Sequence, residues 1–134
     1  MKIVQESGKR KRAIARSTLK TNGTGKIKIN GVPIDKIEPE LARMKLKELL
    51  IIARHEELDD VDIEITVSGG GITGQMDASQ IALSRVIVKF LNDPTVTERI
   101  KNYDRSMLAG DSRQVEPKKW GGRKARARFQ KSFR

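Results

Sequence analysis

The chain has 134 residues, of which 37% are hydrophobic, so it can build one compact core but not the several cores of a multidomain enzyme. Its 28 Lys and Arg residues outnumber its 17 Asp and Glu residues, and the net charge of +11 favours polyanionic partners, nucleic acid above all. Because the chain has no cysteine, disulfides, thiolate nucleophiles and Cys-ligated zinc or iron–sulfur sites are excluded.

The first half of the chain predicts a hairpin followed by a helix. Residues 13–19 and 26–29 flank the turn-forming segment 21–25 and are typical of two antiparallel strands. From Glu40 onward, apolar residues fall at positions i, i+3, i+4 and i+7, a spacing that predicts an amphipathic helix. This helix is expected to end near Glu56.

A strand and an apolar helix are predicted next. Residues 61–67 alternate between apolar and polar side chains, so one face of this strand enters the core. The following helix is expected to be capped by Asp77 or Ser79 and to end near Leu91. Its apolar residues lie nearly all round the axis, which indicates a central position.

The last third of the chain predicts a short helix over residues 97–103 and a final strand over residues 105–115, with no periodic apolar pattern beyond Pro117. Together the elements predict an α+β fold of two layers, in which helices pack on a mostly antiparallel sheet. We expect a globular domain over residues 1–110, with a basic N-terminal segment, and an extended basic tail over residues 111–134.

The positive charge is concentrated at the two ends. Residues 1–20 hold seven basic and one acidic residue, residues 21–110 hold twelve and fourteen, and residues 111–134 hold nine and two. The ends have too little apolar surface to offset the ~1–2 kcal/mol of backbone entropy lost per ordered residue. We therefore expect both basic ends to order only on a partner.

The opening residues lack the apolar stretch of a secretory signal, and no window approaches the ~18 apolar residues of a membrane span. We expect a soluble, cytoplasmic protein with no membrane partner.

A run of cations near the N-terminus supplies the first candidate phosphate ligands, which are Lys9, Arg10, Lys11, Arg12 and, slightly further on, Arg16. Neighbouring cations repel one another unless phosphates lie between them. A solvated arm or a nuclear-localisation-like patch are the alternatives, but the basic bias at the other end of the chain favours phosphate binding.

The C-terminal segment interleaves cations with small and aromatic residues. Its candidate phosphate ligands are Lys118, Lys119, Arg123, Lys124, Arg126 and Arg128. Trp120, Phe129 and Phe133 offer ring faces for base stacking, which favours RNA over duplex DNA and which a merely solubilising tail would not need. The pair Gly121 and Gly122 predicts a pliable backbone, and packing of Trp120 back on the domain stays open. At ~3.3 Å per residue the tail can reach about 80 Å, enough to thread into a large assembly.

Other residues point away from catalysis. The glycine-rich segment 69–75 resembles part of a phosphate-binding loop but lacks the Gly-Lys-Ser/Thr ending, so we reject nucleotide hydrolysis; a close RNA contact and a tight crossover both stay open. We interpret His55 as structural and the acidic residues of segment 59–64 as solvated surface, since they lack EF-hand spacing. No serine has a Gly-x-Ser-x-Gly context. We expect no catalytic residue, no metal site and no cofactor.

Several blocks of sequence carry a family resemblance. They span residues 8–16, 29–31, 69–75, 111–119 and 124–126. Because these blocks occur in this order and at this spacing, the chain resembles the universal small-subunit ribosomal protein nine family. The sequences at residues 116–119 and 132–134 are similar to those of the archaeal and eukaryotic branch of this family.

The resemblance implies a fold like the second domain of ribosomal protein five, with a left-handed βαβ crossover. It implies a structural, non-enzymatic part in the small ribosomal subunit, where the chain binds the 3′ major domain of the rRNA in the head, beside neighbouring head proteins. The cations of the tail would line the rRNA path, while Lys131, Phe133 and Arg134 would face peptidyl-site tRNA. Phe133 lacks the hydroxyl of the Tyr that is usual in this branch. A free nucleic-acid chaperone or chromatin-type binder is the alternative.

Overall fold

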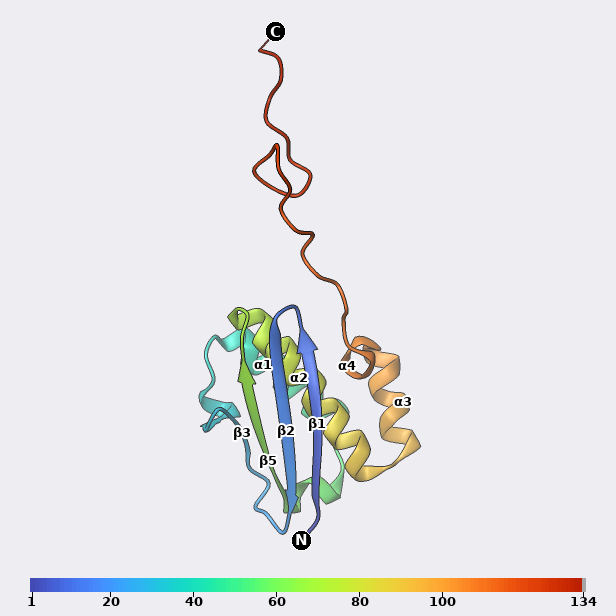
Figure 1. Cartoon of the computed structure of the whole chain (residues 1–134). Helices are drawn as coiled ribbons and strands as arrows, with labels where there is room; N and C mark the ends of the chain where they lie inside the picture. The colour runs from blue at the N-terminus through green and yellow to red at the C-terminus, as the bar shows by residue number, and fades with distance from the viewer. Residues whose placement is uncertain (134) are drawn as a thin grey trace.

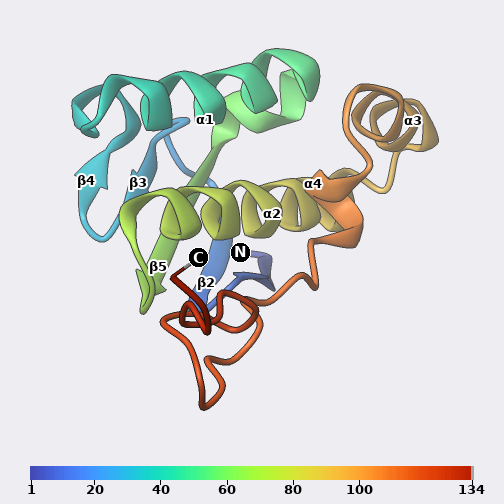
Figure 2. The ribbon, with the colours of Figure 1, turned by 90° about the horizontal axis from the view of Figure 1, so that it is seen from above.

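Five strands form one sheet, and the long helices pack against one of its faces (Figures 1 and 2). The structure is a computed structural model that describes residues 1–133. Its strands, in the spatial order β1-β2-β5-β3-β4, are β1 (Ile3–Arg10), β2 (Ala13–Thr21), β3 (Ile27–Ile29), β4 (Val32–Pro33) and β5 (Val61–Ser68). Its helices are η1 (Ile34–Lys36), α1 (Glu40–Ile52), η2 (Glu56–Asp60), α2 (Ile72–Leu91), α3 (Pro94–Tyr103) and α4 (Ser106–Ala109). The predicted α+β fold with a mostly antiparallel sheet is confirmed.

The predicted hairpin between residues 13–19 and 26–29 is wrong. β2 pairs with β1 and β5, and β3 lies on the far side of β5. The turn-forming segment is tied to β5, because Asp62 Oδ1 accepts hydrogen bonds from the backbone N–H groups of Thr24 (2.9 Å) and Lys26 (3.1 Å). These bonds lead the chain over the end of β5, so that the turn does not fold back on β2.

The crossover from β3 through α1 to the parallel strand β5 has the less common handedness. β3 and β5 are parallel, with Ile27 opposite Ile63 and Ile29 opposite Ile65. In Figure 1 both strands run upward, α1 lies behind the sheet, and β5 stands to the right of β3. This path is left-handed, as the family resemblance implied, whereas nearly all such crossovers are right-handed.

Helix α2 lies across β1 and β2 at the centre of the core. Ala78, Ala82, Leu83 and Val86 are buried in this contact. A Cβ atom at Gly8 of β1 would lie 2.5 Å from the carbonyl oxygen of Ala78 and 2.6 Å from the backbone nitrogen of Ala82. Only glycine at position 8 lets the strand and the helix approach so closely, and the predicted central position of α2 is confirmed.

Three helix boundaries differ from their predicted positions. α3 ends at Tyr103 as predicted but begins at Pro94 and not at Thr97, because Asp93 caps it by accepting the N–H of Thr95 at 2.9 Å. α1 begins at Glu40 as predicted but ends at Ile52, and the separate turn η2 follows, in which His55 Nδ1 accepts the Glu57 N–H at 3.2 Å. α2 begins at Ile72 and not after Asp77 or Ser79. Neither side chain caps the helix, because the Asp77 carboxylate pairs with Lys45 (3.0 Å) and the Ser79 hydroxyl donates to a carbonyl one turn earlier.

The predicted strand over residues 105–115 is also wrong. Its first part is the short helix α4, which starts where Asp104 Oδ1 accepts the N–H of Ser106 at 2.9 Å. Gly110 then adopts a φ of 82°, and only Asp111 forms a bridge to a strand, at Arg10 of β1. A short helix, whose first N–H group is hydrogen-bonded by a nearby side chain, therefore forms where an extended strand was predicted.

Candidate nucleic-acid interface

The N-terminal cations lie on a folded hairpin. Lys11 and Arg12 form the turn between β1 and β2, with Lys11 at a φ of 54°. The expectation that this segment orders only on a partner is wrong, since β1 pairs with β2 over eight residues and buries Val4 and Gly8. These contacts supply the burial and backbone hydrogen bonds that composition alone did not reveal.

The glycine-rich loop packs directly on this turn. Gly69 and Gly70 have φ values of 78° and 65°, and a Cβ atom at Gly69 would lie 2.7 Å from the carbonyl oxygen of Arg12. Of the two alternatives for this loop, the structure supports the tight connection that the fold requires. The loop also leads into the N-terminus of α2, where no side chain caps the first N–H groups.

The cationic turn, the glycine-rich loop and the start of the tail line one hollow of about 540 Å³. Its walls are formed by residues 10–12, residues 70–74 and residues 114–115. Gln114 Nε2 donates to the Lys11 carbonyl at 3.2 Å, which holds the tail against the turn. Lys11, Arg12 and the uncapped helix end thus place positive charge around a concave surface, which suits a phosphate.

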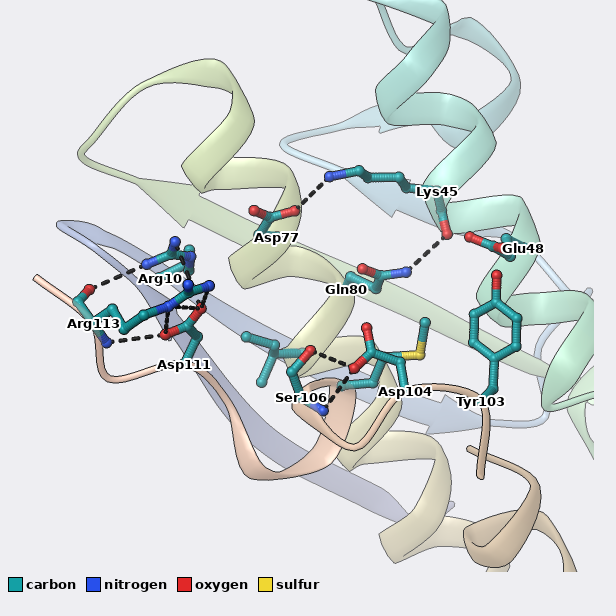
Figure 3. Close-up of a pocket in the computed structure, with 12 residues that line it drawn as sticks. Arg10, Lys45, Glu48, Asp77, Gln80, Tyr103, Asp104, Ser106, Asp111 and Arg113 are labelled. Carbon is teal, nitrogen blue, oxygen red and sulfur yellow. Dashed lines mark hydrogen bonds and ion pairs between the residues drawn. The ribbon is translucent and has the colours of Figure 1, made fainter. Parts of the chain in front are cut away.

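An ion cluster fixes the start of the tail, seen at the left of Figure 3. The Arg113 guanidinium hydrogen-bonds the Asp111 carboxylate, with 2.7 Å from Nη2 to Oδ2, and Arg10 Nη2 lies 3.6 Å from the same oxygen. Hydrogen bonds from Arg113, with the nearby charge of Arg10, hold the pKa of Asp111 well below its usual range. Arg10 also donates to the Arg113 carbonyl at 3.2 Å, so this predicted phosphate ligand serves to anchor the tail.

Residues 116–129 form a closed loop, here called the tail loop (Figure 1). The Glu116 carboxylate accepts from Lys119 Nζ (2.6 Å) and from Arg126 Nε (2.9 Å), and these hydrogen bonds lower its pKa. Arg128 Nη1 donates to the Trp120 carbonyl at 2.7 Å. Three of the predicted phosphate ligands, Lys119, Arg126 and Arg128, therefore also hold the loop closed.

Gly122 is buried inside the tail loop, and a Cβ atom there would overlap the Ala127 carbonyl oxygen. Besides any pliability that the glycine pair gives the backbone, Gly122 has a packing role, because only glycine allows this close approach. The Trp120 side chain is 98% exposed, so it does not pack back on the domain. Its ring face, and those of Phe129 and Phe133, are open to solvent.

The remaining candidate ligands point to solvent. Among residues 1–133 no ion pair holds Lys9, Lys11, Arg12, Arg16, Lys118, Arg123, Lys124 or Lys131, and all of these residues are exposed. The first four lie at the turn or in its two strands, the next three lie in the tail loop, and Lys131 lies beyond it. Arg134 lies outside the described residues. The structure thus brings the turn cations close to the tail start, while the tail cations lie further along the chain (Figure 1).

Arg85 was missed by the sequence reasoning. This cation within the apolar run of α2 donates to the carbonyls of Ser7 (2.8 Å), Leu108 (2.8 Å) and Ala109 (3.2 Å). It therefore joins β1 to α4 and sets where the tail leaves the body. A charged residue between buried neighbours, Ser84 and Val86, was the signal that could have identified it.

His55 and Asp62 both hold backbone groups in place. His55 has the structural part expected of it, as the acceptor at the start of η2. Asp62 is not merely solvated surface, since it binds two backbone N–H groups that lower its pKa. Within residues 1–133 no group of three His, Cys, Asp or Glu side chains could hold a metal ion, and no helix there is long and apolar enough to cross a membrane.

Comparison with known proteins agrees with these features. The model of the family described as "Ribosomal protein S9/S16" matches residues 8–134. The small ribosomal subunit protein uS9 of Methanothrix thermoacetophila is 50% identical over 134 residues and covers all of both chains. The protein of the same name from Halobacterium salinarum is 45% identical, over 98% of this chain and 99% of its own. That of Desulfurococcus amylolyticus is 48% identical, over 100% of this chain and 94% of its own. With a family match over almost the whole length and relatives this similar, the chain belongs to the ribosomal protein S9/S16 family.

Proposed function

We propose that this chain is a structural protein of the small ribosomal subunit that binds rRNA through the cationic turn and the tail. The observation that carries the proposal is the exposed tail loop, in which Trp120 faces solvent beside Arg123 and Lys124, two exposed cations that have no ion pair among residues 1–133. Aromatic faces beside unpaired cations suit single-stranded or looped RNA, whose bases can stack while its phosphates are neutralised. As a ribosomal protein by family, the chain is not an enzyme.

The proposed acceptor is the 3′ major domain of the small-subunit rRNA, in the head of the cytoplasmic ribosome. Residues 1–110 would dock as the body, with Lys9, Lys11, Arg12 and Arg16 toward phosphate, and residues 111–134 would follow the RNA outward. The hollow between the turn, the glycine-rich loop and the tail start supports a contact at the point where the two basic regions meet. With about seven phosphate contacts, the log–log salt slope of binding to single-stranded RNA should be near −5.

The end of the tail is proposed to reach peptidyl-site tRNA. Lys131 and Phe133 are exposed, and in Figure 1 this end lies far from the sheet and helices. A cation at position 131 and the terminal Arg134 would meet tRNA phosphate, while the Phe133 ring would contribute packing without a hydrogen bond.

Deletion of residues 131–134 tests this tRNA contact. We expect small subunits to assemble normally with the shortened chain but to release peptidyl-site tRNA faster in a filter-binding assay. The control variant Lys36→Ala/Lys101→Ala removes two exposed body cations and should leave the release rate unchanged. Equal tRNA retention by the deletion variant and the wild type would contradict the proposal.

A free nucleic-acid chaperone or chromatin-type binder would need the same basic regions but no particular acceptor. Sedimentation through a sucrose gradient in moderate salt separates the two. A subunit protein remains with the small-subunit peak, whereas a general binder is stripped and spreads through the gradient. Family membership favours the first outcome.

A further inference from the structure

The outer face of α1 carries large apolar side chains that nothing within residues 1–133 covers. Leu41, Met44 and Ile51 are 67%, 55% and 74% exposed. They lie on the side of the helix opposite the buried residues Ala42, Leu46, Leu49 and Ala53. The side chains Leu41, Met44 and Ile51, with Glu48 between them, are here called the α1 face. Large apolar side chains gathered on one exposed helix face are typical of a protein contact.

A hollow of about 340 Å³ adjoins the α1 face (Figure 3). Lys45, Glu48, Asp77, Gln80, Tyr103 and Asp104 are among the residues that line it. Some of the charged side chains that line this hollow form ion pairs and others do not. Lys45 is neutralised by Asp77 at 3.0 Å, whereas Glu48 and Asp104 form no ion pair within residues 1–133.

These two carboxylates, of which that of Asp104 accepts hydrogen bonds from Ser106, lie beside an exposed aromatic ring. Figure 3 shows Tyr103 next to Glu48, with Asp104 nearby, on the side of the hollow away from the Arg10, Asp111 and Arg113 cluster. Tyr103 is 53% exposed. Carboxylates together with an aromatic face are the groups that bind a guanidinium or ammonium side chain.

The surrounding charge disfavours RNA at this face. Residues 38–60 contain seven acidic and four basic residues, in a chain whose net charge is +11. Three of those four cations, Arg43, Lys45 and Lys47, are already paired with carboxylates. Phosphate would be repelled by this region, while a basic protein segment would be attracted.

We propose that the α1 face and its hollow bind a Lys- or Arg-bearing segment of another protein. Apolar side chains of that segment would cover Leu41, Met44 and Ile51, and one of its cations would enter the hollow between Glu48, Tyr103 and Asp104. The chain would thus have a protein-binding side that is distinct from its RNA-binding turn and tail. The contact itself is independent of the tRNA proposal, but its test uses the small subunit and so rests on the proposed function.

Photo-cross-linking in purified small subunits tests the proposal. A benzoylphenylalanine residue replaces Ile51 in one variant and Val115, at the tail start, in another; both positions are exposed, so the fold is preserved. We expect position 51 to cross-link to a protein segment that contains Lys or Arg. Cross-links from position 51 to rRNA alone, to an acidic segment, or to nothing would overturn the proposal. Position 115 should cross-link to rRNA, and failure there would count against the proposed RNA contacts instead.

A charge reversal adds a second measurement. With the photoreactive residue at position 44, Glu48→Lys should lower the protein cross-link yield by about fivefold, which corresponds to the loss of one favourable charge contact. The matched control Glu64→Lys changes an exposed carboxylate on the outer face of β5 and should leave the yield unchanged. Equal yields from Glu48→Lys and the control would show that no cation occupies the hollow.

Discussion

The cationic turn and the tail both carry many positive charges, but only the turn is held in place by strands and a helix. The cationic turn belongs to a hairpin whose β1 strand packs on α2, with Gly8 in contact with the helix backbone. The tail carries its cations on a segment without helix or strand over residues 112–133, closed on itself only by the tail loop. Positive charge and low apolar content therefore do not decide whether a segment folds. What decides is whether small and apolar residues within it find a partner surface.

The largest effect is expected where the turn region meets the core. Gly8→Val should destabilise the protein by ~3 kcal/mol, since even its Cβ atom would press on the α2 backbone at Ala78 and Ala82. Urea unfolding followed by circular dichroism measures this loss. Gly71→Ala is the matched control, because no atom lies within 4 Å of a Cβ built there, and it should change the stability by less than ~0.5 kcal/mol. Similar losses for both variants would contradict the proposed close packing of β1 on α2.

Arg85 links the body to the start of the tail, so its removal should affect both regions. Arg85→Met retains an apolar stem but removes the guanidinium group, so three carbonyls lose their hydrogen-bond donor. We expect the free energy of unfolding to fall by ~2 kcal/mol. Hydrogen exchange should rise at residues 108–111 more than within β2. Lys89→Met, one turn further along the same helix, is the control: its more exposed side chain makes one ion pair, with Glu6, and one long hydrogen bond, to the Gln5 carbonyl at 3.4 Å, so the effect should be much smaller. Uniform exchange changes across the sheet would contradict a local anchoring role.

Much of the body could be predicted from the sequence, for identifiable reasons. Alternation over residues 61–67 predicted β5, and the apolar spacing after Glu40 predicted α1, because each pattern reports which face of an element is buried. The same patterns do not report which strands are neighbours. The parallel pairing of β3 with β5 and the left-handed crossover depend on long-range contacts such as those of Asp62 with the backbone N–H groups at positions 24 and 26.

The functional class was predicted more completely than the contacts of the site. Interleaved cations and aromatics predicted RNA binding from residue types alone. Their partners were not visible, because pairs such as Glu116 with Arg126 and Arg10 with Asp111 join residues far apart in sequence. The contact of Gly122 with the Ala127 carbonyl likewise exists only once the tail loop has closed.

A glycine change in the tail should affect RNA binding and not stability. Gly122→Ala places a methyl group against the Ala127 carbonyl and should open the tail loop. We expect the free energy of unfolding to stay within ~0.5 kcal/mol of the wild type, since the tail loop lies away from the sheet and helices (Figure 1). Affinity for single-stranded RNA should fall about fivefold, because an open loop must be ordered upon binding. Ser112→Ala, an exposed tail change outside the loop, should alter neither quantity, and an unchanged affinity for Gly122→Ala would show that RNA does not need the closed loop.

The smallest effect is a pH dependence that differs between the tail loop and the body. Lys119 and Arg126 lower the pKa of Glu116, so its contacts favour the closed loop at pH values above the ordinary carboxyl pKa of about 4 and are lost as the pH falls through the lowered value. The fluorescence of Trp120 should therefore be constant from neutral pH down to about pH 4 and change only below it. In Glu116→Gln the loop lacks its charged acceptor at every pH, so the acid transition of Trp120 should disappear, whereas Asp62→Asn should leave that transition intact because Asp62 binds the backbone of the body. An acid transition that survives in Glu116→Gln would mean that another group closes the loop.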